Sequence, residues 1–264
     1  MIGAIIGDIV GSRFEFNNIK TKEFELVTKD SVFTDDTVLT IALMDWILHS
    51  EVKNVETSAR YLQKWARKYP YAGYGSRFSS WIYEEDPKPY NSCGNGSAMR
   101  ISPIAFAYFN DYELEKEMVV KATASTHNHP EGIKGAMVIS HCISMARNGC
   151  SKEMIKEYAL EQYPEIATFD YEELRRTYYH GAEICQESVP QALYCFFISS
   201  SVEDCLRTTI SIGGDCDTTA AMNTPIAEAY YKDIDPILIN KIRDKLPLEM
   251  LVIIDEFKDK YGGF

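Results

Sequence analysis

Residues 37–49 read TVLTIALMDWILH, and this stretch decides the fold class of the chain. At helical spacing, one face of this stretch carries Val38, Ile41, Ala42, Asp45, Trp46 and His49. Leu39, Leu43 and Ile47 lie beside this face and widen its apolar arc. An apolar arc of this width is typical of a helix that is covered on most of its sides. The stretch therefore predicts a mostly buried helix.

Comparable helical patterns recur along most of the chain. They cover residues 55–69, 97–109, 113–125, 131–148, 151–162, 170–186, 203–212, 218–231 and 236–261. Alternation with a period of two is almost absent, and the best strand candidate is the short run LYCFFIS at residues 193–199. The pattern predicts an all-α protein.

The composition indicates one globular domain over residues 1–264. The sequence is 45% hydrophobic and 25% charged, which provides for a substantial core and excludes a disordered chain. The formal net charge of −12 would repel a phosphate backbone, so no nucleic-acid partner is expected. A small phosphorylated ligand would need a cation or a set of backbone N–H groups to overcome that negative field.

The N-terminal segment and the cysteines predict a cytoplasmic protein without a membrane partner. The segment MIGAIIGDIVGS has no basic residue ahead of its apolar run and contains Asp8, unlike a signal peptide. No run approaches the ~20 apolar residues that span a bilayer. The seven cysteines form no C-x-x-C pair, so we expect reduced thiols in the core.

Two irregular segments interrupt the helical pattern, at residues 11–35 and 70–96. The second is rich in Gly, Pro, Ser, Asn and aromatic residues. Loops of this length inside a compact domain are usually functional. We therefore expect residues 70–96 to contribute to a binding site.

Two clusters of acids and threonines each stand directly before a predicted helix. They are Phe33-Thr34-Asp35-Asp36-Thr37 and Gly213-Gly214-Asp215-Cys216-Asp217-Thr218. Either cluster could cap its helix, because short polar side chains accept the free N–H groups there. A cap needs one oxygen, however, and the clusters together offer four carboxylates and two hydroxyls. Such an all-oxygen set suits two hard divalent cations, so we predict that the fold joins the clusters at a metal site.

Two further motifs are candidates for ligand binding. Ser92-Cys93-Gly94-Asn95-Gly96-Ser97 is either a simple turn before a helix or a nest of backbone N–H groups that receives a diphosphate. Thr126-His127-Asn128-His129-Pro130 resembles a nuclease motif in its His-Asn-His tripeptide. No further metal ligand stands at a supporting spacing, which argues against a nuclease.

These blocks follow a glycine-rich N-terminal motif, Gly3-x-x-x-Gly7-Asp8-x-x-Gly11-x-x-x-Glu15-Phe16, and in this order they resemble the ADP-ribosylglycohydrolase family. The resemblance extends from residue 3 to about residue 225. It implies a compact, orthogonal multi-helix bundle with two divalent cations, Mg²⁺ or in some members Mn²⁺, at the bottom of a cleft. The implied reaction is hydrolysis of the N- or O-glycosidic bond that joins ADP-ribose to a protein side chain or a small acceptor. We expect a monomer that acts on such a conjugate.

The resemblance also implies roles for single residues. The metal ligands would be Thr34, Asp35, Asp36, Asp215, Asp217 and Thr218. Asp36 and Glu15 are the candidates for proton transfer. The substrate would be bound by Tyr74, Ser92, Gly94, Asn95, Gly96, Ser97 and His127, with Tyr74 and Trp81 as candidates for stacking on adenine.

Three smaller points complete the sequence-based expectations. His129 is predicted to cap the helix that follows it, and Met99 to lie in the core. The alternatives to an ADP-ribosylglycohydrolase are a hydrolase of another nucleotide sugar and a catalytically silent relative that only binds ADP-ribose.

Overall fold

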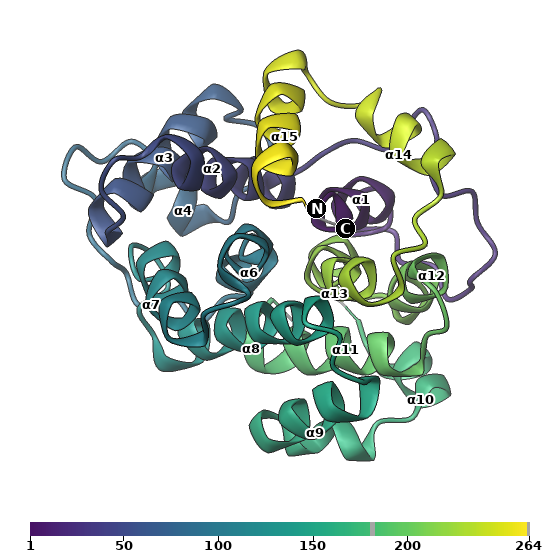
Figure 1. Ribbon diagram of the computed structural model, residues 1–264. Helices are drawn as coiled ribbons and strands as arrows, with labels where there is room; N and C mark the ends of the chain where they lie inside the picture. The colour runs from purple at the N-terminus through teal and green to yellow at the C-terminus, as the bar shows by residue number, and fades with distance from the viewer. Residues whose placement is uncertain (180–182, 263–264) are drawn as a thin grey trace.

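The computed structural model describes residues 1–179 and 183–262, and this part of the chain is helical without a β-strand (Figure 1). The helices are α1 (Gly3–Gly11), α2 (Asp35–His49), α3 (Val55–Lys68), α4 (Ser76–Trp81), α5 (Gly96–Met99), α6 (Ser102–Tyr108), α7 (Tyr112–Thr123), α8 (Pro130–Arg147), α9 (Lys152–Gln162), α10 (Tyr171–Thr177), α11 (Cys185–Ile198), α12 (Val202–Ile212), α13 (Cys216–Tyr231), α14 (Pro236–Arg243) and α15 (Leu248–Tyr261), with a 3-10 helix at Pro164–Thr168. The all-α prediction is confirmed.

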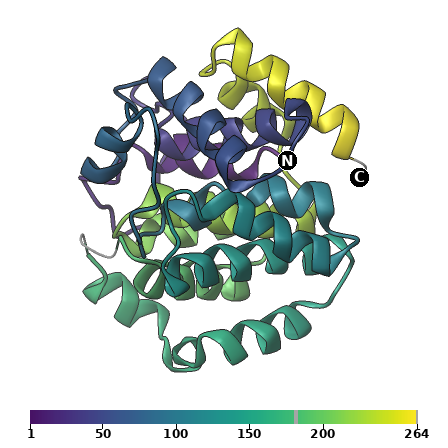
Figure 2. The same cartoon turned by 90° about the vertical axis from the view of Figure 1, so that its left-hand side faces the viewer.

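Helix α13 lies at the centre of the fold. It packs against α1, α8, α11 and α12, and all but its last two residues are buried (Figure 1). Small residues, four alanines and three threonines among them, give this helix no large side chain on most faces, so neighbours approach it from several sides. Figure 2 shows α1, α2 and α15 in the upper half of the molecule and the helices from the middle of the chain in the lower half.

Helices α1 and α13 share the most extensive helix–helix contact in the described part of the chain. A Cβ atom placed on Gly7 would lie 2.4 Å from the carbonyl carbon of Ala220, and one placed on Gly11 would lie 2.4 Å from the Cα atom of Asp217. The two backbones therefore touch, which only glycine permits. This contact brings Asp8, on the same turn of α1, next to Asp217.

We expect Gly11→Ala to be strongly destabilising, because its methyl group would meet backbone atoms that cannot move independently of α13. Overpacking of this kind typically costs about 1–3 kcal/mol in the free energy of unfolding. Gly75→Ala is the matched control, since nothing lies within 4 Å of its added Cβ. Denaturant unfolding of both variants measures the difference, and equal stabilities would contradict the close packing of α1 on α13.

Several predicted boundaries were wrong. The segment 236–261 is two helices, because Pro247 stands before α15 and cannot continue α14. The segment 97–109 is likewise divided into α5 and α6, and the segment predicted at 170–186 is helical in α10 only as far as Thr177 and again from Cys185. Residues 180–182 lie outside the described part. The predicted irregular segment 70–96 contains the short helix α4.

The strand candidate at residues 193–199 was also wrong, since residues 193–198 belong to α11. The helices α8, α12 and α13 pack against α11 and bury Leu193, Cys195 and Phe196 of this run. A short, continuous apolar run has no period by which to distinguish a strand from a buried helix. The helix prediction at residues 37–49 is confirmed by α2, which is buried from Asp36 to Ile47.

The expectation of reduced thiols in the core holds for five of the seven cysteines, since Cys93 and Cys150 are free but only half-buried. Cys142, Cys185, Cys195, Cys205 and Cys216 are buried free thiols, and Met99 is buried. None of the helices in residues 1–179 and 183–262 combines the length and the hydropathy needed to cross a bilayer.

Candidate active site

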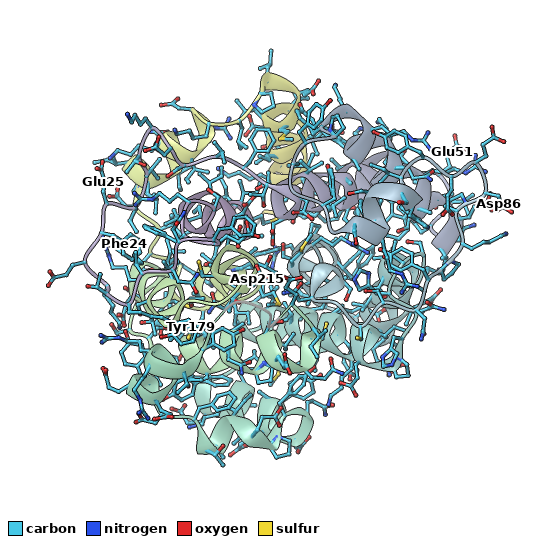
Figure 3. All side chains as sticks on the ribbon, turned by 180° about the vertical axis from the view of Figure 1, so that it is seen from behind. Phe24, Glu25, Glu51, Asp86, Tyr179 and Asp215 are labelled. Atoms are coloured by element: carbon cyan, nitrogen blue, oxygen red, sulfur yellow. The ribbon has the colours of Figure 1, made fainter. Side chains whose placement is uncertain are left out.

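The two acid clusters, far apart in sequence, meet in the fold. The N-terminus of α2 carries Asp35 and Asp36, and the N-terminus of α13 follows Asp215. The Thr218 hydroxyl donates a hydrogen bond of 3.2 Å to Asp36 Oδ2 and so joins them directly. Figure 3 shows Asp215 near the middle of the molecule, between the N-terminal helices and the middle part of the chain.

Capping does not explain these clusters. Thr34 and Asp215 occupy the N-cap positions of α2 and α13, but neither side chain makes a capping hydrogen bond. The Oδ2 atom of Asp8, on α1, instead accepts from the backbone N–H groups of Thr34 at 2.9 Å and Thr37 at 3.1 Å. The cap of α2 therefore comes from another helix, and the carboxylates of α2 and α13 are left for another purpose.

The carboxylates form two groups of three that share one member. Oxygen atoms of Asp8, Asp36 and Asp217 lie within 4.8 Å of one another, and so do those of Glu15, Asp215 and Asp217. The hydroxyl of Thr34 lies 2.7 Å from Asp8 Oδ1 and 3.2 Å from Asp36 Oδ2.

Among the residues predicted as metal ligands, only Asp35 lies outside both groups and the hydrogen bonds that surround them. It instead lines a cleft that Glu15 and Asp215 also line. Asp8 had no assigned role in the sequence analysis, and it belongs to the first group.

The acids are buried without compensating cations. Asp8, Asp36 and Asp217 are each at most 2% exposed, and within the described residues none of them forms an ion pair with lysine or arginine. The Oδ1 atoms of Asp36 and Asp217 are buried with no hydrogen-bond partner in that part of the chain. Buried charges are normally paired or bound to a metal, so these unsatisfied oxygens fit a divalent cation.

The electrostatics of the site agree with this crowding. Burial raises the pKa values of Asp36 and Asp217 well above the ordinary range, and the neighbouring carboxylates raise them further. Burial, followed by the charges of Asp215 and Asp8, raises the pKa of Glu15 to about 7. Without metal, the site would therefore retain protons at neutral pH.

The second acid group borders, through Glu15 and Asp215, a cleft of about 440 Å³, a volume within the range of small-ligand sites. The cleft is lined by Glu15 and Asp215 from the second acid group, by Asp35 and Thr218 beside the groups, and also by Gly94, Gly96, Arg100 and His127. A larger, open groove of about 1070 Å³ runs between α3 and residues 83–89. Its charged side chains pair locally, as Arg60 does with Glu56 and Lys88 with Asp86, so the cleft is the better candidate.

The predicted nest is only partly free to bind a ligand. The N–H of Gly94 donates to Ser92 Oγ, and the N–H of Asn95 donates to the carbonyl of Glu183. Within the described residues no acceptor is present for the N–H groups of Gly96 and Ser97, which begin α5. Two backbone N–H groups are thus available to a ligand, fewer than the sequence suggested.

The polar side chains of the nest form hydrogen bonds within the protein. Asn95 Nδ2 donates to Asp215 Oδ2 at 2.6 Å and joins the nest to the acid groups. The Ser97 hydroxyl is fully buried and donates to the carbonyl of Gly132 on α8. The side chains of Asn95 and Ser97 therefore hold the turn, and the backbone N–H groups of Gly96 and Ser97 are left for contact with a ligand.

His127 lies directly over the nest. Its Nε2 atom is 3.3 Å from the position that a Cβ atom on Gly96 would occupy, and 3.6 Å from that on Gly94. The prediction that His129 caps α8 is confirmed, because its Nδ1 atom accepts from the N–H of Glu131. The two histidines of the motif thus have separate roles.

The aromatic residues differ from expectation. Trp81 is 1% exposed and donates to the carbonyl of Lys88, so it is not available for stacking on adenine. The ring of Tyr74 packs on Phe78, and its hydroxyl is buried. Tyr90, which the sequence analysis missed, lines the cleft between Arg77 and His127. The sequence could have indicated Tyr90 as a site residue, because it lies in the long loop of residues 70–96.

Comparison with known proteins agrees with this architecture. A sequence model of the family described as ADP-ribosylglycohydrolase matches residues 1–260. The chain belongs to the ADP-ribosylglycohydrolase family. It is, accordingly, a glycohydrolase.

Relatives of this ADP-ribosylglycohydrolase include the mouse protein named ADP-ribosylhydrolase ARH3, which is 27% identical over 88% of this chain and 82% of its own length. The ADP-ribosyl-[dinitrogen reductase] glycohydrolase of Rhodospirillum rubrum is 23% identical over 96% of this chain and 92% of its own. A solved structure titled "ADP-ribosylglycohydrolase-related protein complex" has a TM-score of 0.72 and 22% identity, covering 98% of this chain and 95% of that one. The structural likeness establishes the fold.

Proposed function

We propose that this glycohydrolase cleaves the glycosidic bond between ADP-ribose and an acceptor, with two divalent cations held by the acid groups. The observation that carries the proposal is the pair of carboxylate groups that share the buried Asp217 and border the cleft through Glu15 and Asp215. The family match supports the ADP-ribose part of the substrate. Relatives named for ADP-ribosylated substrates support it further.

The residues fit Mg²⁺ or Mn²⁺. We propose Thr34, Asp35, Asp36, Asp215, Asp217 and Thr218 as ligands, and the structure adds Asp8 and Glu15 as further carboxylates within reach. All of these ligand atoms are oxygens, which hard cations prefer. Capping two helix N-termini would not require so many carboxylates. When bound, the cations would supply positive charge for the ribose hydroxyls and for a nearby water molecule.

Side chains of the protein can accept and donate the protons that the reaction transfers. Departure of the acceptor passes through an oxocarbenium-like transition state, which is helped by a base that takes a proton from water. Glu15 lies at the edge of the cleft, and its pKa of about 7 suits proton exchange near neutral pH. Asp36 is the second candidate, and its deep burial suits a role in orienting the reacting groups.

The opposite wall of the cleft would hold the rest of the substrate. The free N–H groups of Gly96 and Ser97 and the His127 ring are the proposed donors to the diphosphate. These donors are neutral or nearly so, which allows an acidic protein to bind an anion without adding surface cations. Tyr90, at the rim, provides an aromatic face.

A panel of substrates tests the proposal. Purified protein is incubated with ADP-ribose linked to arginine, to serine or to acetate, in Mg²⁺ or Mn²⁺, and released ADP-ribose is measured. We expect release from at least one conjugate that requires a cation and stops on chelation, because the acid groups cannot otherwise hold substrate and water. Hydrolysis of another nucleotide sugar, such as ADP-glucose, with none of the conjugates cleaved would contradict the proposed substrate.

A further inference from the structure

In the wall of the cleft, three buried side chains form a hydrogen-bonded chain, of which the proposed function uses only His127. Arg100 Nη2 donates to Thr126 Oγ1 at 2.8 Å, and Thr126 Oγ1 lies 2.7 Å from His127 Nδ1. Arg100 is 1% exposed, Thr126 is fully buried and His127 is 5% exposed. Burial of an arginine is unfavourable because the guanidinium group loses its hydration, so we asked what this burial achieves.

The direction of these hydrogen bonds follows from their chemistry. A guanidinium group can only donate, so Thr126 Oγ1 accepts from Arg100 and has a single hydrogen of its own to give. Two acceptors are near: His127 Nδ1 at 2.7 Å and the carbonyl of Thr123 at 3.4 Å. The first distance is ideal for an O–H donor and the second lies beyond the usual range. We therefore assign His127 Nδ1 as the acceptor, since the opposite direction would leave the Thr126 hydrogen with only the long contact to Thr123.

This direction decides where the hydrogen of His127 lies. A neutral imidazole with Nδ1 as acceptor carries its hydrogen on Nε2. Burial, together with the charge of Arg100, lowers the pKa of His127 well below its ordinary value, so the ring is neutral at neutral pH. The Nε2 atom is the one that lies over Gly94 and Gly96.

We propose that Arg100 and Thr126 are positioning residues, which fix His127 as an Nε2–H donor aimed at the anion-binding turn of Gly94 to Gly96. The inference rests on the proposed function in one respect: the anion is taken to be the diphosphate of ADP-ribose. Arg100 itself acts through Thr126 and needs no contact with the ligand. The arrangement explains why a buried threonine and a buried arginine accompany the histidine.

The first test is spectroscopic and needs no ligand. Nitrogen-15 NMR of the wild-type protein at neutral pH should show His127 protonated on Nε2 and unprotonated on Nδ1. In Thr126→Val, which removes only the hydroxyl, the ring should lose this single preference, and Thr126→Ser should restore it. A wild-type ring protonated on Nδ1 would overturn the proposal.

The second test measures binding of ADP-ribose by calorimetry in the presence of Mg²⁺. Thr126→Val should weaken binding by about tenfold, the effect of losing one well-placed hydrogen bond to a charged group. Thr126→Ser should bind like the wild type. Thr123→Val is the matched control, because Thr123 is equally buried but its hydroxyl bonds only within α7, to the carbonyls of Val119 and Val120. Arg100→Met, which keeps the unbranched stem of the side chain but removes its donors, should resemble Thr126→Val.

The outcomes separate the inference from the proposed function. Wild-type protein that fails to bind ADP-ribose, with His127 protonated on Nε2, contradicts the proposed function and the ligand assigned here, while the hydrogen-bonded chain itself is supported. Equal binding by the wild type and Thr126→Val, with Thr126→Val folded as judged by its melting curve, would overturn the positioning role.

Discussion

Asp217→Asn should lower the rate of ADP-ribose release by about 100-fold or more. Changes to residues that merely orient metal ligands commonly cost 10–100-fold, and Asp217 is the one carboxylate that belongs to both acid groups. Asparagine has the same shape but no charge, so the loss reports the missing negative charge. Asp36→Asn should have a similar effect, because it removes a charge from the first group. Initial rates with the best conjugate at saturating Mg²⁺ measure both.

A matched aspartate shows whether helix capping could produce the same result. Asp235 caps α14 by accepting from the N–H of Ile237, and it is exposed and absent from the cleft. Asp235→Asn should leave the rate and the response to Mg²⁺ unchanged, since asparagine caps about as well as aspartate. Wild-type activity in Asp217→Asn would remove the acid groups from the proposed mechanism.

The second large effect concerns stability, pH and metal together. In the metal-free protein the buried acids repel one another, by about 1–4 kcal/mol for each close pair depending on the effective dielectric. The folded-state pKa values of Glu15 and Asp35 are raised to about 7 and about 8, from 4.5 and 3.8. The folded state therefore binds more protons than the unfolded state between about pH 4 and pH 8, and metal-free stability should fall as pH rises through this window.

Magnesium should reverse this trend. It binds the folded state in preference to the unfolded one, so it should raise the melting temperature with increasing concentration. The rise should be larger at the alkaline end of the window, where the carboxylates are ionised. Asp217→Asn should be at least as stable as the wild type without metal above pH 7, and the Mg²⁺-induced rise should be lost. This behaviour is opposite to that of an ordinary damaging substitution.

Melting curves between about pH 5 and pH 9, with chelator and with Mg²⁺, measure both effects. Other acids do not produce the same trend, because the pKa values of Asp45 and Asp204 are lowered and their contributions are lost only at more acidic pH. A metal-free protein that gains stability from pH 5 to pH 8, together with a wild type indifferent to Mg²⁺, would contradict the crowded carboxylate site.

Much of the fold class and of the candidate site could be predicted from the sequence alone. The broad apolar arc of residues 37–49 is visible without any neighbour, because it follows from the helical period itself, and α2 has that position and burial. The composition of the clusters at Asp35–Asp36 and Asp215–Asp217 likewise indicated a metal site, since the number of charges exceeds what capping needs. These inferences are local, and each depends on residues that are close in the chain.

The tertiary structure decided which of these residues act together. Asp8 joins the acid groups only because Gly7 and Gly11 let the backbone of α1 touch that of α13, a contact between residues about 200 positions apart. In the same way, Trp81 is buried by its neighbours, and Thr126 acquires its partner Arg100 only when α5 packs beside α8. The physical reason is common to all three cases. Hydrophobic periodicity reports the surroundings of one helix, whereas the identity of the side chain across an interface depends on how closely two backbones can approach.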